Sequence, residues 1–400
     1  MTMADPTTSP RLRVLVAHPG AELFGSDRML VESVAGLRAA GHAVLVTVPT
    51  DGPMLEAVRA LGASIVIAPT LVLRKSLIAP SGWLQLISGA ARGLAAGIRL
   101  VLRARPDVIY VNTVTIPLWI AVGRMTGRPV LCHVHEAERS ARPVLRRALS
   151  APVLFARTVV ANSDFSADVL GDSFSALGDR VGIVPNGVAG PAETTTARDG
   201  IDGPLRVLYV GRLSDRKGVD VAIAAMAELR RGGTPAELDV VGSVFAGNEE
   251  YEAALVEQIR DEGLGDAVRM LGFQPDVWDA YRRCDVAVVP SRVDEPFGNT
   301  AVESLLAGRP VVVSDTSGLR EASSGFESAQ RVRPGDAAAL AAALRSVYED
   351  WPTFRDAALI DRDIAHSRHS TELYRTRMSA AVEATAAGRA WGVEGSDDGT

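Results

Sequence analysis

Hydrophobic residues in the first half of the chain gather into short continuous runs, and an amphipathic segment follows most of them. The runs lie at residues 11–18, 43–48, 64–68, 107–112, 129–134, 158–161 and 181–184. Helical patterns separate them, the first over residues 27–40. Continuous Val, Ile and Leu runs are typical of parallel strands that helices cover on both faces. Residues 11–188 therefore predict a doubly wound, Rossmann-like α/β domain.

This alternation stops between residues 189 and 204, where Gly, Pro, Thr and Asp predominate, which predicts a linker. It resumes with apolar runs at 205–210, 237–241, 268–271, 286–290 and 310–314. We therefore expect a second Rossmann-like domain over 205–365 and a helix over 366–390 that packs back on the first domain. The polar ends, 1–10 and 391–400, are expected to be disordered. Two such domains would face a central cleft lined by the carboxyl ends of both sheets, where open α/β sheets bind ligands.

The composition fits two full-sized cores, since 47% of residues are hydrophobic and 22% are charged. Cys132 and Cys284 lie in apolar runs, which predicts reduced, buried thiols rather than a disulfide or a zinc site. No signal peptide is recognisable, because residues 1–10 are polar. No uncharged apolar run reaches about 18 residues, the length that a spanning helix needs. A cytoplasmic protein is expected.

The net charge of −6 conceals a basic segment. Residues 74–157 hold 13 Lys and Arg against three Asp and Glu, together with apolar residues such as Trp83, Leu84 and Ile87. This combination suits an anionic membrane surface, such as the inner membrane face, or a lipid-phosphate acceptor. The alternative is a set of Arg-rich helices that are simply solvated. We predict no nucleic-acid partner.

Two loops hold the candidate chemistry of the second domain. The first is Gly211-Arg212-Leu213-Ser214-Asp215-Arg216-Lys217-Gly218, directly after a strand. Arg212 offers a forked pair of donors and Lys217 a mobile point charge, a combination that suits a diphosphate. Such sheets bind ligands in the loops that follow their strands, which favours a binding role for Arg212 and Lys217. We interpret Arg216 as a solvated surface charge.

The second loop runs Glu295-Pro296-Phe297-Gly298 and leads into a helix that begins near Asn299 or Thr300. A helix N-terminus presents backbone N–H groups and a positive dipole end to a phosphate. Glu295 and Glu303 would hold hydroxyl-rich groups on either side. One alternative stays open: Thr300 and Glu303 have the spacing of a capping box, in which Glu303 would bond the Thr300 N–H.

The order of these two motifs resembles the GT-B fold, retaining, nucleotide-sugar-dependent glycosyltransferases of family 4. The resemblance covers nearly the whole chain. Further matching segments are Arg105-Pro106-Asp107-Val108, His133-Val134-His135-Glu136, Asn162-Ser163, Val184-Pro185-Asn186-Gly187 and Leu271-Gly272-Phe273.

The resemblance implies roles for several of the matched residues. Glu295 would contact the transferred sugar, Glu303 the ribose, and Arg212 and Lys217 the diphosphate, with His135 near the sugar. The remaining donor-binding candidates are Gly272, Phe273, Phe297, Gly298, Asn299 and Thr300. Acceptor-side candidates are Gly20, Glu22, Asp27 and Asn112. No metal or other cofactor is expected, and a glycan or lipid-linked sugar is the expected acceptor.

Other classes fit less well. A glycoside hydrolase needs two carboxylates on opposite sides of the bond, whereas Glu295 and Glu303 flank one phosphate site. A dinucleotide oxidoreductase needs Gly-x-Gly-x-x-Gly after a first strand, which neither domain has. His135 could instead be a hydrogen-bonded loop histidine without a functional role, and Glu295 a surface glutamate. A non-catalytic nucleotide-sugar-binding protein of the same fold remains an alternative, although all four charged residues are present.

Overall fold

The computed structural model describes residues 11–391, except 24, 74–82, 138, 140 and 246. The chain divides into two compact units, Met1–Gly187 with Thr371–Thr400, and Val188–Ser370. Each is built on one parallel sheet, which confirms the predicted α/β class. The segments predicted to be disordered, 1–10 and 391–400, lie outside the described residues apart from Trp391. Part of the basic segment, 74–82, also lies outside them.

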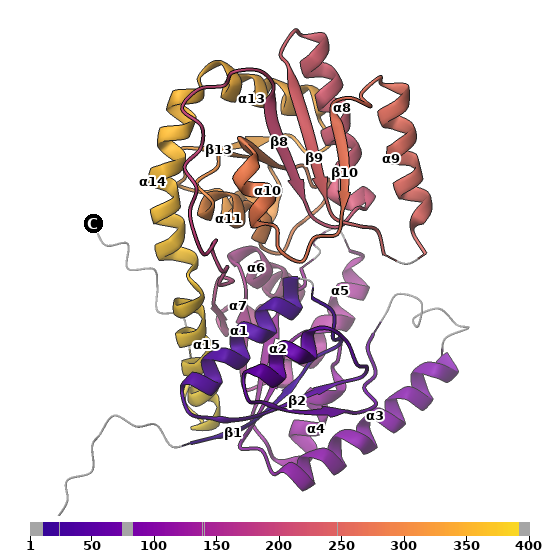
Figure 1. Cartoon of the computed structure of the whole chain (residues 1–400). Helices are drawn as coiled ribbons and strands as arrows, with labels where there is room; N and C mark the ends of the chain where they lie inside the picture. The colour runs from indigo at the N-terminus through magenta and orange to yellow at the C-terminus, as the bar shows by residue number, and fades with distance from the viewer. Residues whose placement is uncertain are drawn as a thin grey trace, which may run out of the picture. The chain divides into compact units, whose positions relative to one another are not determined.

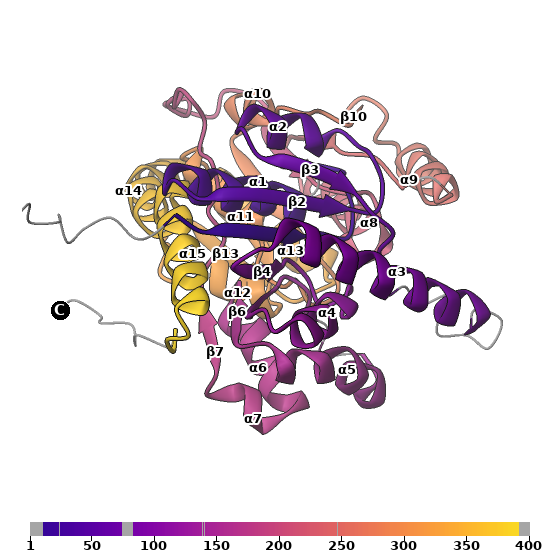
Figure 2. The ribbon, with the colours of Figure 1, turned by 90° about the horizontal axis from the view of Figure 1, so that it is seen from below.

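The first unit holds seven parallel strands in the order β3-β2-β1-β4-β5-β6-β7, and Figure 2 looks across them from below. The strands are β1 (Arg13–Ala17), β2 (Ala43–Val48), β3 (Ser64–Ile67), β4 (Val108–Val111), β5 (Val130–Val134), β6 (Thr158–Ala161) and β7 (Val181–Ile183). In the register of the central strands, Leu15 pairs with Leu45 of β2 and Ile109 of β4. The sheet order therefore reverses direction between β1 and β4.

Helices cover both faces of this sheet. They are α1 (Gly25–Ala39), α2 (Met54–Ala60), α3 (Trp83–Ala104), α4 (Leu118–Thr126), α5 (Pro143–Ser150), η3 (Ala151–Phe155), α6 (Asp164–Ser173), α7 (Ser175–Gly178) and α15 (Thr371–Ala386). Successive strand side chains point to opposite faces, so Val14 and Val16 enter one core while Leu15 and Ala17 enter the other. None of the helices within the described residues has the length and apolarity needed to cross a membrane.

The last helix of the chain, α15, belongs to the first unit and lies beside α1 (Figure 1). Tyr374 and Met378 are buried in the same core as Val14. The Tyr374 hydroxyl lies 2.7 Å from Ser33 Oγ of α1, and Arg375 Nε donates to Glu32 Oε2 at 2.7 Å. The chain thus returns from the second unit to complete the core of the first.

The second unit holds six parallel strands in the order β10-β9-β8-β11-β12-β13. They are β8 (Leu205–Val210), β9 (Ala236–Val241), β10 (Val268–Gly272), β11 (Val286–Val289), β12 (Val311–Ser314) and β13 (Ala329–Val332). The helices are η4 (Asp215–Lys217), α8 (Val219–Arg231), α9 (Glu249–Asp261), α10 (Trp278–Arg283), α11 (Asn299–Leu306), α12 (Ser317–Ala322), α13 (Ala337–Glu349) and α14 (Trp351–His369). Val207 and Leu208 again enter opposite cores. Cys132 and Cys284 are buried free thiols, as predicted.

The segment predicted as a linker, residues 189–204, forms no helix or strand but packs onto the second unit. Arg198 pairs with the buried Asp285 at 2.6 Å, and the Trp351 indole donates to the Arg198 carbonyl at 2.9 Å. Arg309, itself buried, donates to the carbonyl of Thr195 at 3.0 Å. The segment is therefore held along much of its length.

The loops after β8 and β11 approach each other closely at Gly218. Gly218 has φ 68°, and a Cβ placed there would lie 2.1 Å from the carbonyl oxygen of Pro290. Only glycine allows both the backbone conformation and this approach. The close contact brings the two sequence motifs of the second unit together.

We predict that Gly218→Ala destabilises the second unit more than Gly233→Ala. Gly233 also has a positive φ, 83°, but no atom lies within 4 Å of its Cβ position. Gly233→Ala should lower the free energy of unfolding by only about 1–2 kcal/mol, the cost of a left-handed backbone conformation. Gly218→Ala should lower it by about 1–3 kcal/mol more, because the new methyl group displaces the Pro290 carbonyl. Chemical unfolding followed by circular dichroism measures both. Equal losses would show that the approach to Pro290 is unimportant.

Candidate functional site

The two motifs of the second unit meet where its sheet order reverses, between β8 and β11. Loop 211–218 follows β8, loop 290–298 follows β11, and the two strands are paired neighbours. The Arg292 N–H donates to the Arg216 carbonyl at 2.9 Å, which joins the loops. Open α/β sheets bind ligands at this kind of reversal, outside the carboxyl ends of the strands.

An ion pair between Lys217 and Glu295 connects the two loops. Lys217 Nζ lies 2.7 Å from Glu295 Oε1, and Ser291 Oγ donates to the same oxygen at 2.8 Å. Both bonds use Oε1, and within the described part of the chain no residue bonds Oε2. Because an ammonium group has three donors, Lys217 keeps two N–H groups for a ligand. The pair thus offers a carboxylate oxygen and a cation side by side.

The backbone of Glu295 is also fixed. The Gly318 N–H donates to the Glu295 carbonyl at 3.0 Å, and Ser317 Oγ donates to the same oxygen at 3.3 Å. A Cβ at position 318 would lie 2.4 Å from that oxygen, so the start of α12 approaches it closely. Glu295 is therefore held from both its carbonyl and its carboxylate.

Helix α11 begins at Asn299, after Gly298 with φ 116°. Gly298 is the N-cap and no side chain caps the helix, so Thr300 lies inside the first turn. The capping-box alternative for Thr300 and Glu303 is therefore wrong. The N–H groups of a first turn lack carbonyl partners four residues earlier within the helix, which leaves this end suited to an anion.

Glu303 is nearly buried, and Tyr281 lies beside it. The Tyr281 hydroxyl is 3.4 Å from Glu303 Oε2 and 3.1 Å from the Thr300 carbonyl oxygen, within reach of both. Glu303 lies within α11 among buried residues, where a carboxylate is costly to bury without polar partners. Its placement beside the N-terminal turn of α11 is compatible with a hydroxyl-binding role.

Arg212 is positioned by two aromatic residues. Its guanidinium carbon lies 3.5 Å from the centre of the Phe245 ring, a cation–π contact. The buried Tyr209 donates its hydroxyl to the Arg212 carbonyl at 2.8 Å. Burial, and then the negative charge of Glu295, raise the pKa of Tyr209 well above its usual value, so the phenol remains a donor.

The other donor-side candidates divide into exposed and buried residues. Gly272 ends β10 with φ 70°, its carbonyl accepts from the Gly242 N–H at 2.9 Å, and Phe273 beside it is 57% exposed. Phe297 is instead buried, with its ring 5.6 Å from that of His369. The predicted contact of Phe297 with a donor is therefore corrected: its ring is a core residue, and only its backbone remains a candidate.

The carboxyl edge of the first unit brings other candidates together. His18, Asn112 and His135 each directly follow a strand, and those strands, β1, β4 and β5, are neighbours. Asn112 is fully buried and Asp27 is 5% exposed. Their side chains bond His135 and His18 respectively, which favours a positioning role over the predicted direct contact with an acceptor. Gly20 has no neighbour within 4 Å of a Cβ, and Glu22 is exposed.

Burial, and then the nearby His18, lower the pKa of His135 to about 3. The side chain is therefore neutral near pH 7. Its Nε2 lies 2.9 Å from Asn112 Oδ1, so the alternative of a hydrogen-bonded loop histidine accounts for one ring nitrogen only.

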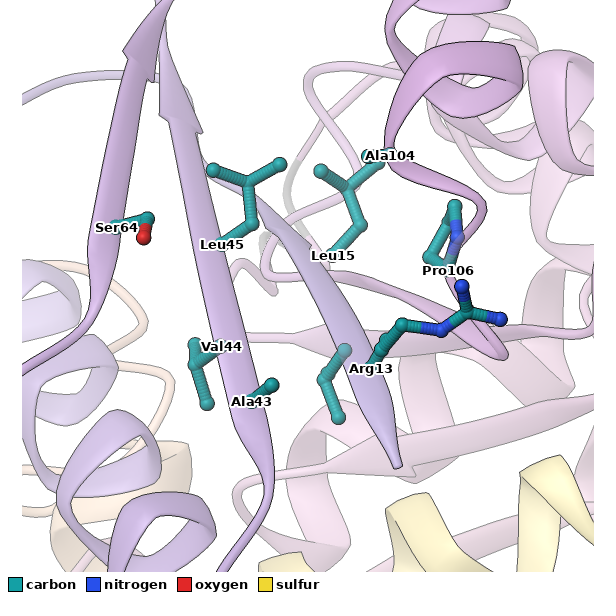
Figure 3. A pocket seen from close by; sticks show the side chains of 9 residues that line it. Arg13, Leu15, Ala43, Val44, Leu45, Ser64, Ala104 and Pro106 are labelled. Atoms are coloured by element: carbon teal, nitrogen blue, oxygen red, sulfur yellow. The ribbon is translucent and has the colours of Figure 1, made fainter. Parts of the chain in front are cut away.

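A pocket of about 190 Å³ lies at the opposite edge of this sheet (Figure 3). Arg13, Ala43 and Ser64, the first residues of β1, β2 and β3, help to line it. Its walls are mostly apolar, and Arg13 is paired with Asp107 at 2.9 Å. None of the predicted site residues lines it, although Pro106 of the matched segment 105–108 does.

Metal-ligating side chains do not form a cluster of three or more anywhere in the described residues. Asp361, part of an Asp-Arg-Asp sequence, accepts from the N–H and hydroxyl of Ser328 at 2.7 and 2.6 Å. That carboxylate is a structural acceptor inside the second unit.

The sequence did not predict a role in the second-unit site for four residues: Ser291, Tyr281, Phe245 and Tyr209. A usable signal existed for Phe245, because its loop follows β9, the neighbour of β8, at the same sheet edge. Tyr281 lies on α10 and Tyr209 within a strand, where the pattern predicts core residues. Their hydroxyl contacts depend on tertiary packing.

Comparisons with known proteins agree on one family. The model "Glycosyltransferase Family 4" matches residues 25–189, and "Glycosyl transferases group 1" matches residues 193–359. The first match lies almost entirely in the first structural unit and the second match lies in the second unit.

The curated relatives match over part of their length. A glycogen synthase from Mycobacterium tuberculosis (strain CDC 1551 / Oshkosh) is 38% identical over 176 residues, 40% of this chain and 41% of the relative. A D-inositol 3-phosphate glycosyltransferase from Nocardia farcinica (strain IFM 10152) is 30% identical over 240 residues, 56% of this chain and 52% of the relative. The chain thus spans about two fifths to one half of these two proteins.

Among solved structures, Anabaena Alr3699/HepE in complex with UDP-glucose has the same fold. The TM-score is 0.79 at 21% identity, over 94% of this chain and 100% of that one. Two parallel-sheet units, two matching family models and this structural likeness support the resemblance that the motifs predict. The chain belongs to the GT-B fold glycosyltransferases of the family 4 type.

Proposed function

We propose that this protein is a retaining glycosyltransferase that moves a sugar from a nucleoside-diphosphate sugar to a glycan or lipid-linked acceptor. The observation that carries the proposal is the Lys217–Glu295 pair, which joins the two loops at the reversal of the second sheet. A hydrolase or a dinucleotide-binding domain would not need a cation and a carboxylate placed together beside a helix N-terminus. The Anabaena protein of the same fold, solved in complex with UDP-glucose, supports a donor of this class.

The charges of the second unit suit the departing diphosphate. Arg212 can present a forked donor pair and Lys217 two free N–H groups, while the first turn of α11 adds backbone donors. Positive groups placed in advance around a leaving group that gains charge supply a large part of catalysis. In this scheme the side chains themselves compensate the charge, so no metal ion is needed.

The carboxylates would bind hydroxyl groups. Glu295 Oε2 is the oxygen that its internal partners leave for the transferred sugar, and Glu303 would take the ribose hydroxyls with Tyr281 beside it. In the transfer the bond from the anomeric carbon to the phosphate oxygen breaks. A bond to the acceptor oxygen forms on the same face, and the acceptor proton passes to the departing phosphate oxygen. Retention of configuration follows from that geometry.

A panel of nucleoside-diphosphate sugars tests the donor class, by thermal shift and by slow donor hydrolysis. We expect saturable binding of at least one member. Lys217→Ala and Glu295→Ala should each lower turnover of that donor by a factor of about 10² or more, as expected for a lost electrostatic contact, while circular dichroism stays unchanged.

The matched control is Arg216→Ala, an exposed cation in the same short 3₁₀ turn. It should keep turnover within a few-fold of the native protein. Near-normal rates for Lys217→Ala or Glu295→Ala would remove that residue from the mechanism. Binding of no panel member would favour a non-catalytic protein of this fold.

The acceptor proposal rests on helix α3. The segment carries no acidic residue, and Leu84, Ile87 and Leu102 are 80%, 66% and 63% exposed. Arg92, Arg99 and Arg103 repeat at spacings of seven and four, which places them along one side of a helix. Both ribbon views show the amino-terminal part of α3 projecting from the body of its unit (Figures 1 and 2).

Exposed apolar residues beside unpaired cations are typical of helices that lie on anionic membranes. Arg92 Nε donates to the Ser88 carbonyl at 3.3 Å, and within the described residues no carboxylate pairs with Arg92, Arg99 or Arg103. We therefore propose a peripheral, cytoplasmic position at the inner membrane face and an acceptor linked to lipid, as in the synthesis of cell-surface polysaccharide or glycolipid. The Lipopolysaccharide 1,2-N-acetylglucosaminetransferase of Salmonella typhimurium, 31% identical over 153 residues, is compatible with such an acceptor.

We predict that replacing Arg92, Arg99 and Arg103 together by Gln weakens binding to phosphatidylserine-containing vesicles at low salt. At about 1 kcal/mol per basic residue, the loss should be on the order of a hundredfold in a vesicle sedimentation assay. The same replacement at Arg230, Arg260 and Arg320, exposed in the second unit, changes the net charge equally and should have little effect. Native protein that ignores these vesicles and glycosylates a water-soluble acceptor would contradict the proposal.

A further inference from the structure

A chain of buried polar groups runs along the carboxyl edge of the first sheet. His18 Nε2 lies 2.7 Å from Asp27 Oδ1, and His18 Nδ1 lies 3.0 Å from Asn112 Nδ2. On the other side of the same amide, Asn112 Oδ1 lies 2.9 Å from His135 Nε2. The chain crosses the reversal between β1 and β4 and ends at the one predicted catalytic residue of this unit.

The hydrogen-bonding capacities of these groups fix where the protons lie. A carboxylate only accepts, so His18 donates to Asp27 from Nε2. The NH₂ group of Asn112 only donates, and it lies against His18 Nδ1, so this ring nitrogen accepts. The carbonyl of Asn112 therefore faces His135, and His135 must donate from Nε2.

Tyr110 supports the same orientation of the amide. Its hydroxyl donates to Asn112 Oδ1 at 2.8 Å, so two donors converge on that oxygen. The Tyr110 oxygen lies 2.8 Å from His133 Nδ1 and 3.1 Å from Ser33 Oγ. Ser33 is in turn bonded to Tyr374 of α15. The carboxyl-terminal helix thus helps to hold the network.

The position of His135 is restricted from two more sides. Its ring centre lies 3.9 Å from that of His133, and its backbone N–H donates to Glu136 Oε2 at 3.3 Å. Burial lowers the pKa of His133 well below its usual value, so the two adjacent rings are both neutral and do not repel each other. With Nε2 bonded to Asn112, the remaining polar atom of His135 is Nδ1, which bonds no residue that the structure describes.

We propose that Asp27, His18 and Asn112 are positioning residues that hold His135 as the Nε2–H tautomer, so that Nδ1 accepts a hydrogen bond from a sugar hydroxyl. The ligand part of this inference rests on the proposed function. The tautomer does not, because it follows from contacts within the first unit. A histidine with an unprotonated Nδ1 requires a hydrogen-bond donor, such as a hydroxyl group, from the ligand. The opposite tautomer would present an N–H group to the same place.

Histidine ring ¹⁵N chemical shifts at pH 7 test the proposal without any sugar. The chain has six histidines, and comparison with His135→Gln identifies the signals of residue 135. We expect an unprotonated Nδ1 and a protonated Nε2 for His135. A protonated Nδ1 in the native protein would overturn the proposal.

Variants test whether the far end of the chain sets this tautomer. In Asp27→Asn the residue at position 27 can donate as well as accept, so a measurable population of the Nδ1–H form should appear at His135. His18→Gln can still donate to Asp27 and accept from Asn112, and should keep the native tautomer. An unchanged single tautomer in Asp27→Asn would overturn the relay.

Two further variants cover folding and local effects. Ser173→Ala removes a buried hydroxyl of the same unit that donates to the Val169 carbonyl at 2.7 Å, and should leave the His135 signals unchanged. If Asp27→Asn does not fold, Asn112→Leu removes the acceptor of His135 Nε2 directly and should produce both tautomers. Failure of the nucleotide-sugar panel would not alter these spectra, so the two proposals fail separately.

Discussion

The close approach of two loops at the reversal of the second sheet is the constraint on which the site depends. β8 and β11 are neighbours, so their following loops emerge side by side, and Gly218 lets one loop touch the Pro290 carbonyl of the other. The Lys217–Glu295 pair then closes the contact at 2.7 Å. A partly buried ion pair is by itself weak evidence for stability. Its importance is that it places a cation and a carboxylate at one point.

Several features from different parts of the unit support that point. Ser291 shares the Glu295 carboxylate oxygen, and Gly318 holds the Glu295 carbonyl. Phe245 and Tyr209 restrict Arg212 at its guanidinium and its carbonyl. Groups that are fixed before a ligand arrives lose less conformational freedom when it binds. In the second unit these contacts hold the candidate anion-binding residues in place, whereas in the first unit a buried hydrogen-bonded chain runs from Asp27 to His135.

The sequence predicted the architecture because both domains repeat a simple pattern. Continuous apolar runs at regular intervals identify parallel strands, and the motifs fall directly after strands, where ligands of such sheets bind. Arg212, Lys217 and Glu295 were predicted in this way, whereas His135 was predicted from the resemblance to the family. Glu303 could not be resolved from the sequence, because Thr300 and Glu303 have capping-box spacing. The structure shows that Gly298 caps the helix instead.

Other details depended on packing that no local pattern encodes. Phe297 lies within the motif but points into the core, and Asp27 and Asn112 look like surface candidates yet are buried. The contacts of Tyr281 with Glu303 and of Phe245 with Arg212 join segments separated by more than twenty residues. Two neighbouring residues of a loop can face different ways, one toward the site and the other into the core. Only tertiary contacts determine which does which.

Hydrogen–deuterium exchange with and without UDP is the most direct test of the central claim, because the Anabaena protein of the same fold has also been solved in complex with UDP. If the two loops form the anion site, saturating UDP should protect the backbone amides of peptides covering residues 211–218 and 295–303. Peptides at the amino edge of the first sheet, around Arg13 and Ala43, should exchange unchanged. Tight UDP binding with protection elsewhere, and none in those two loops, would contradict the account.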